Sequence, residues 1–514
     1  MTSTSNKDKM NEKAQKLLSD IEIYELEDEE RKSQQKQQHQ LVPRRKQKKA
    51  SVFFTLPTKC CYIFLAASNA CIEPFLNVFL VSTGLTIGQS ALISGIRILA
   101  SLICRPCWYS LCTQKIRRKN TIFWCMCIIA AGLTFPMPWI ADESKNVTLQ
   151  ECVPMKKFRP ANNMIQTNPC SNGTSHNVLF FVMLSVNIAS SVFTSALPLQ
   201  LDVAANDVFT STKYDINLHS QQMYDGIGQS IGALAAGSVA QQYKENYRGV
   251  FSVYLPMVGT LAVASVFLFY QVRSVPFVRQ KHISCTQSAQ GLGIMLKNMN
   301  IIIMMITIVV VGVADGINRY FLLLYMQNIE ATKIQMGLSL AVSGLTSFLM
   351  MKFQRNNLEI SRDNTSALTC LCTFCYALTL FFMSAITNPW LVLPVQLLYG
   401  IGHGIFWSAV QDYFQKQTKN KILTSLNQFI QILKENVGFI IANIIGGVLY
   451  SNDKSSFLFQ VTSFFYFGFT IMLVLLSLVC YVYRKCTKQR KGRINNNKDK
   501  RIQDGPKLMV TDLE

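Results

Sequence analysis

Long apolar runs alternate with short polar segments through most of this chain. A helix needs roughly 20 apolar residues to cross a hydrocarbon core of about 30 Å. Twelve runs approach or exceed this length, at residues 52–81, 89–112, 120–141, 177–201, 224–243, 249–271, 299–327, 336–352, 366–386, 390–412, 423–450 and 456–483. Core helices of soluble proteins are shorter and keep a polar face. The pattern therefore predicts an all-α, multi-pass membrane protein with twelve transmembrane helices.

Charged residues are unevenly shared among these runs. The third, sixth, ninth and twelfth runs carry none in their interiors, and the candidates for buried polar groups lie on the other eight. A charge in hydrocarbon costs at least about 2.5 kcal/mol, so such residues face a bundle interior or a water-filled cavity. The period of three predicts eight helices around a polar centre and four supporting helices outside it. Transporters of two six-helix halves have this arrangement.

Eight residues are candidates for a transport pathway through the polar centre. They are Asn69 and Glu73 on the first run, Arg97 on the second, Asp315, Asn318 and Arg319 on the seventh, His403 on the tenth and Glu435 on the eleventh. Residues four apart share one face of a helix, so Asn69 lies on the same face as Glu73.

The acidic and basic candidates have alternative interpretations. Glu73 could carry a coupling proton or cation, or it could form a structural ion pair with Arg97 or Arg319. Asp315 precedes Arg319 by one turn, which is the favourable order for a pair on one helix, so the two could neutralise each other. Arg319 could instead bind an anionic group of a substrate through its planar set of donors.

His403 and the adjacent residues Lys434 and Glu435 also leave alternatives open. His403 could shuttle protons because histidine titrates near neutral pH, or it could be a buried neutral ring bonded to a helix backbone. Lys434 could extend to the cytosolic end of its helix. Glu435 would then be the intramembrane charge of the eleventh run.

A weak internal repeat relates the two halves of the chain. GLTIGQSALISG follows the first run and EATKIQMGLSLAVSG follows the seventh. Matching Thr86 with Thr332 places Glu73 opposite Arg319. The repeat predicts that the polar centres of the two halves lie at the same depth.

Small residues predict where helices approach closely. Gly228 and Gly232 form a small-xxx-small face on the fifth run, which permits near contact between backbones. Gly400, Gly402 and Gly404 on the tenth run predict close packing or a hinge, since no strand precedes them as a nucleotide-binding loop requires.

Most of the net positive charge lies outside the apolar runs. Of the residues, 49% are hydrophobic and 15% charged, and the formal net charge is +21. Nucleic-acid-binding proteins gather such charge on one face, whereas here it lies mostly in tails and short loops. We predict disordered cytosolic tails at 1–50 and 484–514 and a cytosolic linker at 272–298.

Basic loop residues set the predicted orientation. Arg117, Arg118 and Lys119 follow the second run with no acid to offset them, while loops of the opposite parity carry almost no base. The positive-inside rule then places both termini in the cytosol.

The segment 142–177 is predicted to lie on the luminal or extracellular side. It contains the glycosylation sequons at Asn146 and Asn172, which are used only on that side. Of the sixteen cysteines, Cys152 and Cys170 share this oxidising compartment, so we predict a disulfide between them.

Motifs of enzymes are not found in the sequence. It has no H-E-x-x-H metal spacing, no P-loop and no nucleophile elbow. We therefore predict a protein that is not an enzyme, with no cofactor and no metal.

Several stretches resemble the major facilitator superfamily, and more closely the group called major facilitator superfamily domain-containing protein six. They are IEPFLNVFLVSTGLTIGQSALISGIR, DGINRYFLLLYMQNIEATKIQMGLSLAVSG, HGIFWSAVQDYF and FIQILKENVGFIIANIIGGVLYS. The resemblance covers about 51–483 and implies two pseudo-symmetric six-helix bundles, at 51–271 and 299–483.

One departure from the superfamily follows the second run. Tyr109 stands where glycine is common, and Thr113 and Gln114 stand where an Asp-Arg pair is common. The bases Arg117, Arg118 and Lys119 of the expected cytosolic gating loop are present. The charge relay that the resemblance implies for this loop is weakened.

The predicted function is secondary active or facilitative transport of a small polar or charged solute by alternating access, with the proton as the candidate coupling ion. The alternative is a non-transporting receptor or accessory protein that uses the glycosylated loop 142–177. The expected location is the plasma membrane or an endomembrane. Expected partners are the solute, the lipid bilayer and a protein at that loop or at the cytosolic tails, without nucleic acid.

Overall fold

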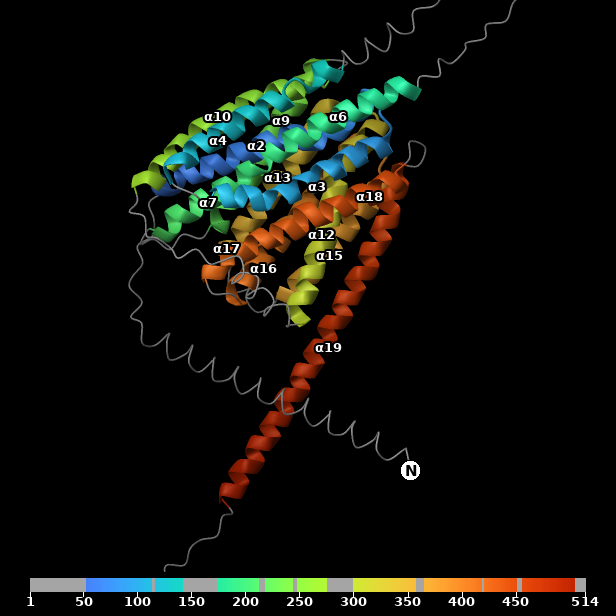
Figure 1. Ribbon diagram of the computed structural model, residues 1–514. Helices are drawn as coiled ribbons and strands as arrows, with labels where there is room; N and C mark the ends of the chain where they lie inside the picture. The colour runs from blue at the N-terminus through green and yellow to red at the C-terminus, as the bar shows by residue number, and fades with distance from the viewer. Residues whose placement is uncertain are drawn as a thin grey trace, which may run out of the picture. The chain divides into compact units, whose positions relative to one another are not determined.

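The computed structural model describes residues 52–112, 116–141, 173–211, 218–243, 247–274, 299–356, 365–417, 420–450 and 455–503 (Figure 1). These residues form helices joined by turns, and no strand occurs among them. The helices of the first half are α2 (Val52–Ser82), α3 (Ile87–Cys112), α4 (Ile116–Thr134), α6 (Gly173–Thr194), α7 (Ala196–Ser211), α8 (His219–Gln222), α9 (Asp225–Gln242) and α10 (Arg248–Ser274). Those of the second half are α12 (Met299–Asn328), α13 (Lys333–Asn356), α15 (Thr365–Ala385), η1 (Pro389–Leu391), α16 (Val392–Gln417), α17 (Asn420–Gln431), η2 (Ile432–Gly438), α18 (Phe439–Leu449) and α19 (Ser455–Gln503).

The protein is an integral multi-pass membrane protein. Eleven spans within the described residues are long and apolar enough to cross a membrane. The fifth predicted run, the helix α9, is not among these eleven. Its 18 residues DGIGQSIGALAAGSVAQQ are rich in Gly, Ala and Gln. It packs against α2, α10 and α13, and glycine and alanine occupy most of its buried positions.

Several of the predicted elements differ from the structure. The fourth run, predicted at 177–201, is divided between α6 and α7 and continues to Ser211. The eleventh run is divided among α17, the π-helix η2 and α18. The twelfth run does not end near residue 483, because α19 continues to Gln503 through part of the tail predicted to be disordered. This extension contains Lys, Arg and Gln, which favour helix, and no proline. The loop 142–172, the linker 275–298 and the tail 1–50 lie outside the described residues.

The helices make contacts both within each half of the chain and between the halves. α2, α3, α4, α6, α7, α9 and α10 contact one another, and α12, α13, α15, α16, α18 and α19 form a second group. The groups meet where α2 contacts α12, α3 contacts α18 and α9 contacts α13. The polar residues discussed below lie on these helices.

The turns that follow α2 and α12 have the same conformation. Gly84 has φ 103° and Glu330 has φ 59°, and no other described residue has a positive φ. The Gly84 N–H bonds Val81 O at 3.0 Å, and the Glu330 N–H bonds Gln327 O at 3.1 Å. A residue in the left-handed region is a common way to end a helix.

The helices after these turns begin with the same cap. The Thr86 N–H donates to Gln89 Oε1 at 3.0 Å, and the Gln89 N–H donates to Thr86 Oγ1 at 3.2 Å. Thr332 and Gln335 form the same reciprocal pair, at 2.8 and 3.3 Å. This capping box satisfies two donors at the start of a helix. The match of Thr86 with Thr332 in the sequence is therefore also a match in structure.

The glycines predicted to allow close packing do so. A Cβ atom built on Gly228 would lie 2.0 Å from Ile63 O, and one on Gly232 would lie 2.2 Å from Ala67 O. In the second half, a Cβ atom on Gly400 would lie 2.5 Å from Ser343 O. Hence α9 contacts the backbone of α2, and α16 contacts that of α13.

We expect Gly232→Ala to lower the free energy of unfolding by about 1–3 kcal/mol, because its methyl group forces α9 away from α2. The matched control is Gly259→Ala on α10, where nothing lies within 4 Å of the added Cβ. That change is neutral or stabilises by up to about 1 kcal/mol, because alanine favours helix more than glycine does. Unfolding of both purified variants in detergent measures the difference, and equal stabilities would contradict the packing.

Candidate functional site

A cavity of about 510 Å³ lies among the helices. Its wall comes from α2, α3, α6, α7, α8, α9, α12, α13, α16, α17, η2 and α18. The helices α4, α10, α15 and α19 contribute no described residue to this wall. They are the third, sixth, ninth and twelfth predicted runs, so the division into lining and supporting helices agrees with the sequence prediction.

The cavity occupies one part of the helices' length. On α2 its wall runs from Tyr62 to Pro74, and on α3 from Arg97 to Tyr109. It therefore extends from mid-depth toward the end at which α2 begins and α3 ends. In the predicted topology this is the cytosolic end.

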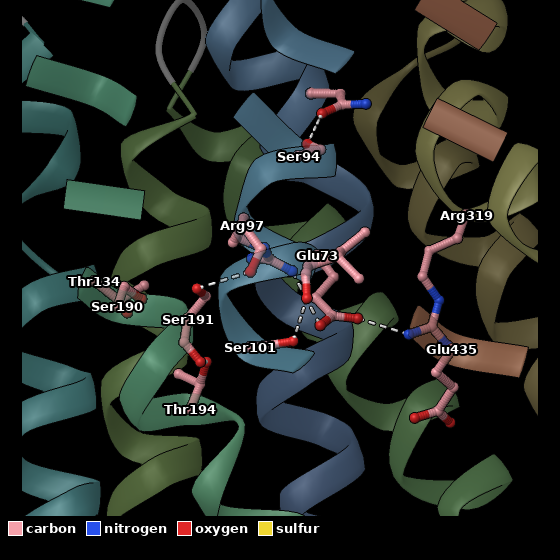
Figure 2. Close-up of polar contacts among 12 residues, drawn as sticks. Glu73, Ser94, Arg97, Ser101, Thr134, Ser190, Ser191, Thr194, Arg319 and Glu435 are labelled. Atoms are coloured by element: carbon pink, nitrogen blue, oxygen red, sulfur yellow. Dashed lines mark hydrogen bonds and ion pairs between the residues drawn. The ribbon is translucent and has the colours of Figure 1, made fainter. Parts of the chain in front are cut away.

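Past the end of the cavity at mid-depth, helices of the two halves contact each other directly. Asn77 donates from Nδ2 to the backbone oxygen of Tyr320 at 3.1 Å, which joins α2 to α12. Ser94 donates to Asn77 Oδ1 at 2.6 Å and fixes the amide (Figure 2). A Cβ on Gly447 would lie 3.0 Å from the Ala91 side chain, so α18 and α3 also lie close together here.

Glu73 bridges two arginines at the deep end of the cavity, which is the end farthest from the predicted cytosolic side (Figure 2). Its Oε1 accepts from Arg97 Nη2 at 3.1 Å and its Oε2 accepts from Arg319 Nη1 at 2.6 Å. Both arginines offered in the sequence as alternative partners are thus bound at once. Arg319 is the more exposed of the two, with 35% of its side chain accessible against 11% for Arg97. Its guanidinium lies 5.3 Å from the centre of the Phe439 ring.

Asp315 and Arg319 do not neutralise each other, so that alternative is wrong. Arg319 binds Glu73, and the Asp315 carboxylate lies 3.0 Å from the Lys434 ammonium. The other oxygen of Asp315 accepts from the hydroxyls of Tyr376 and Tyr399, both at 2.8 Å. A neighbour one turn away stabilises by only about 0.2–0.5 kcal/mol on a helix surface, so contacts from other helices decide the partners of a buried carboxylate.

His403 bonds side chains and not the helix backbone that was one expectation. Its Nδ1 lies 2.9 Å from Ser347 Oγ and its Nε2 lies 2.8 Å from Lys434 Nζ. Nε2 is also 3.5 Å from the second oxygen of Asp315. The lysine ammonium lies 4.7 Å from the centre of the Trp407 ring.

The roles expected of Lys434 and Glu435 are reversed. Lys434 is 7% exposed and sits on Asp315, so it does not extend to the end of its helix. Glu435 has 45% of its side chain exposed and lies 4.0 Å from Arg105. Both belong to η2, where Asn436 donates to Ser101 Oγ on α3 at 3.1 Å.

The remaining pathway candidates lie in the cavity wall. Asn69 and Asn318 both line it. The Asn318 amide exchanges two hydrogen bonds with Gln396, at 3.3 and 2.9 Å. Asn318 therefore joins α12 to α16 within the second half.

The structure describes some of the other predicted residues by their backbone alone and does not describe the rest. The structure places Arg117, Arg118 and Lys119 by backbone only, in the first turns of α4. Asn146, Cys152, Cys170 and Asn172 are outside the described residues. The glycosylation sites and the disulfide remain predictions.

Sequence reasoning missed Tyr376 and Tyr399 and left the position of Lys434 open. Lys434 was recognised as a charge within an apolar run, with extension to the cytosolic end of its helix as one possibility. Tyr376 lies on a run without charges, and such a run gives no signal that one side chain faces the polar centre. Across the helices as described, no three of the residue types that bind metals come together as a metal site.

These features define an integral membrane protein in which two groups of helices enclose a charged central cavity. The family model described as "MFS_1 like family" matches residues 55–461, and the chain belongs to that family. The major facilitator fold predicted from the sequence is thereby confirmed.

Curated relatives carry the name that the resemblance suggested. "Major facilitator superfamily domain-containing protein 6-like protein A" of Xenopus laevis is 24% identical over 204 residues, which are 40% of this chain and 32% of the relative. "Major facilitator superfamily domain-containing protein 6-like" of Homo sapiens is 25% identical over 246 residues, 48% of this chain and 40% of the relative. The matched part is thus less than half of each relative's length.

Solved transporters share the fold. The nucleoside transporter NupG has a TM-score of 0.56 at 11% identity, and the match covers 83% of this chain and 98% of the transporter. A bacterial homologue of the iron transporter ferroportin in an inward-facing state gives 0.60 at 12% identity, with 83% and 99% covered. A D-xylose-proton symporter gives 0.55 at 12% identity, with 82% and 97% covered.

Proposed function

We propose that this protein transports a small polar or charged solute across a membrane by alternating access, and that Arg319 binds an anionic group of the solute. The observation that carries the proposal is the partly exposed guanidinium of Arg319 at the deep end of the central cavity, held by Glu73 of the other half. Membership of the family and the shared fold of solved transporters support it.

The cavity fits a small molecule in size and character. Ligand pockets in proteins commonly measure about 300–1,000 Å³, and this cavity is about 510 Å³. Its wall combines charged groups with aromatic side chains such as Tyr62, Tyr320 and Trp407. Polar groups of this kind orient a solute, and the rings cover its apolar surface.

The charges at the deep end favour an anionic group. Glu73 balances one of its two arginine partners, so Glu73, Arg97 and Arg319 together carry one excess positive charge. Glu435 also interacts with Arg319, but this acid lies 4.0 Å from a base of its own, Arg105. Arginine presents five donors in a planar fork that matches carboxylate and phosphate. Glu73 uses one terminal nitrogen of Arg319, and the second terminal nitrogen can bond an anion that enters the cavity.

The same ion pair relates solute binding to movement of the halves. Glu73 lies on α2 and Arg319 on α12, so their bond and the nearby bond of Asn77 to Tyr320 O join the two halves. A solute anion competes with Glu73 for Arg319 and weakens this connection. A ligand shifts a conformational equilibrium by its difference in affinity for the two states. Competition at Arg319 provides such a difference.

Metabolite profiling tests the proposal without knowledge of the solute. Cells that express the wild-type protein, Arg319→Ala, the control Gly259→Ala or no added protein are compared after each variant is shown to reach the membrane. We expect the level of at least one anionic metabolite to change with wild type and Gly259→Ala, and at least about tenfold less with Arg319→Ala, which loses a charged hydrogen bond. Equal profiles with and without the wild-type protein contradict transport. They would favour a receptor that uses the loop 142–177.

A further inference from the structure

A second group of charges in the cavity wall is not used by the proposed solute site. Asp315 comes from α12, His403 from α16 and Lys434 from η2, and all three line the cavity. Lys434 Nζ lies 3.0 Å from Asp315 Oδ2 and 2.8 Å from His403 Nε2. His403 Nε2 and Asp315 Oδ2 are 3.5 Å apart. The three side chains therefore meet at one point, and each of the three contacts can hold only one hydrogen atom between its two polar atoms.

The contacts determine where the histidine proton lies. A lysine ammonium has three donors and no acceptor. Lys434 therefore donates to His403 Nε2, which accepts and carries no hydrogen. The proton of the neutral ring lies on Nδ1, which donates to Ser347 Oγ on α13 at 2.9 Å.

One further proton changes this arrangement. A proton added to His403 must bind Nε2, and two donors would then face each other across the 2.8 Å contact with Lys434. The nearest acceptor for the new N–H is Asp315 Oδ2, at 3.5 Å, which is the oxygen that Lys434 occupies. The imidazolium and the ammonium thus compete for one carboxylate oxygen.

We propose that Asp315, His403 and Lys434 form a proton-binding site in which a proton on His403 displaces the Lys434 ammonium from Asp315. Only the use of this site in transport rests on the proposed function. Proton binding itself is a property of the three side chains.

The surrounding groups favour exchange at this position. Tyr376 on α15 and Tyr399 on α16 hold the other oxygen of Asp315, so the carboxylate stays in place when its cation changes. Arg319, one turn along α12, also interacts electrostatically with the ring, and it is bound to Glu73. The displaced ammonium can enter the cavity, whose wall includes Lys434.

The site also adjoins a contact between the two halves. Lys434 belongs to the π-helix η2, and two residues later Asn436 donates to Ser101 Oγ at 3.1 Å and to Ile98 O at 3.4 Å on α3. π-Helical turns often occur at functional sites. Movement of Lys434 therefore acts on the segment that contacts the first half, close to Arg97 and the proposed solute site.

Fluorescence of Trp407 tests the site directly, since the Lys434 ammonium lies 4.7 Å from its ring. Purified full-length protein is titrated from about pH 8 to about pH 3, which includes and extends below the range in which histidine commonly changes charge. We expect the Trp407 emission to change in one single-proton step, and Trp407→Phe to identify this signal among the tryptophans. His403→Gln retains an acceptor for Lys434 but takes up no proton, so its signal is flat.

Controls separate this site from other groups and from transport. His219→Gln, on α8, should titrate as the wild type does, and Lys434→Met should lose the signal because no ammonium remains near Trp407. A His403→Gln protein that titrates normally would overturn the proposal. A signal that follows sodium concentration at constant pH would overturn it as well. Because the titration needs no solute, it can succeed where the transport test fails, and the reverse.

Discussion

Lys434→Met is expected to lower the free energy of unfolding by about 3–5 kcal/mol, which is the usual effect of removing one partner of a buried ion pair. Asp315 is 3% exposed, and Lys434 is the lysine that neutralises it, at 3.0 Å. Without Lys434 the carboxylate keeps the hydroxyls of Tyr376 and Tyr399, which bond it but carry no positive charge. The purified variant should therefore unfold at a lower temperature or denaturant concentration than the wild type.

The adjacent residue provides a matched control for this effect. Glu435→Gln removes a charge from the same π-helix, but 45% of the Glu435 side chain is exposed and Arg105 is 4.0 Å away. Exposed pairs contribute about 0–1 kcal/mol, so this variant should be close to wild type. The double variant Asp315→Asn/Lys434→Met removes both charges and should recover part of the loss. If Lys434→Met and Glu435→Gln prove equally stable, Lys434 does not neutralise Asp315.

Glu73→Gln is expected to have the second large effect, on both transport and stability. The change leaves Arg97 and Arg319 with no carboxylate between them at the deep end of the cavity. Two charged hydrogen bonds are lost, but the side chains are partly exposed to the cavity, so we expect a loss of about 1–3 kcal/mol. The amide cannot hold Arg319 as an exchangeable partner, and solute accumulation should fall at least about tenfold.

A double-mutant cycle isolates the bond between the halves. Glu73→Gln, Arg319→Gln and the double variant give the coupling free energy between the two side chains. Because Arg97 also binds Glu73, the cycle with Arg97→Gln measures the bond within the first half for comparison. Coupling to Arg97 without coupling to Arg319 would contradict the proposed connection between the halves.

Most of the fold could be predicted from apolar length and charge position. The requirement that charges avoid lipid separated the lining helices from α4, α10, α15 and α19 before any contact was known. The helix α9 shows the limit of apolarity as a signal. Its neighbours α2 and α13 approach it closely, so glycine and alanine occupy most of its buried positions in place of large apolar residues.

The sequence predicted which residues belong to the candidate site better than it predicted which of them bind each other. Glu73, Arg97 and Arg319 were identified with the correct alternatives, because few charges were available within the apolar runs. The partners of Asp315 were not, since Lys434 lies far along the chain and a sequence contains no distances. The π-helix η2 added a further difficulty. Its number of residues per turn differs from that of an α-helix, so α-helical spacing does not give the face on which Lys434 lies.

The position of each counterion along the chain bears on how the protein is made. Glu73 and Arg97 belong to consecutive helices joined by a short turn, so the first hairpin leaves the ribosome with its carboxylate and its base together. When Arg319 is synthesised, its carboxylate has already been inserted. Asp315 has no such predecessor, because Lys434 is among the later residues to emerge. A nascent chain that stops before η2 therefore holds Asp315 without its ammonium partner.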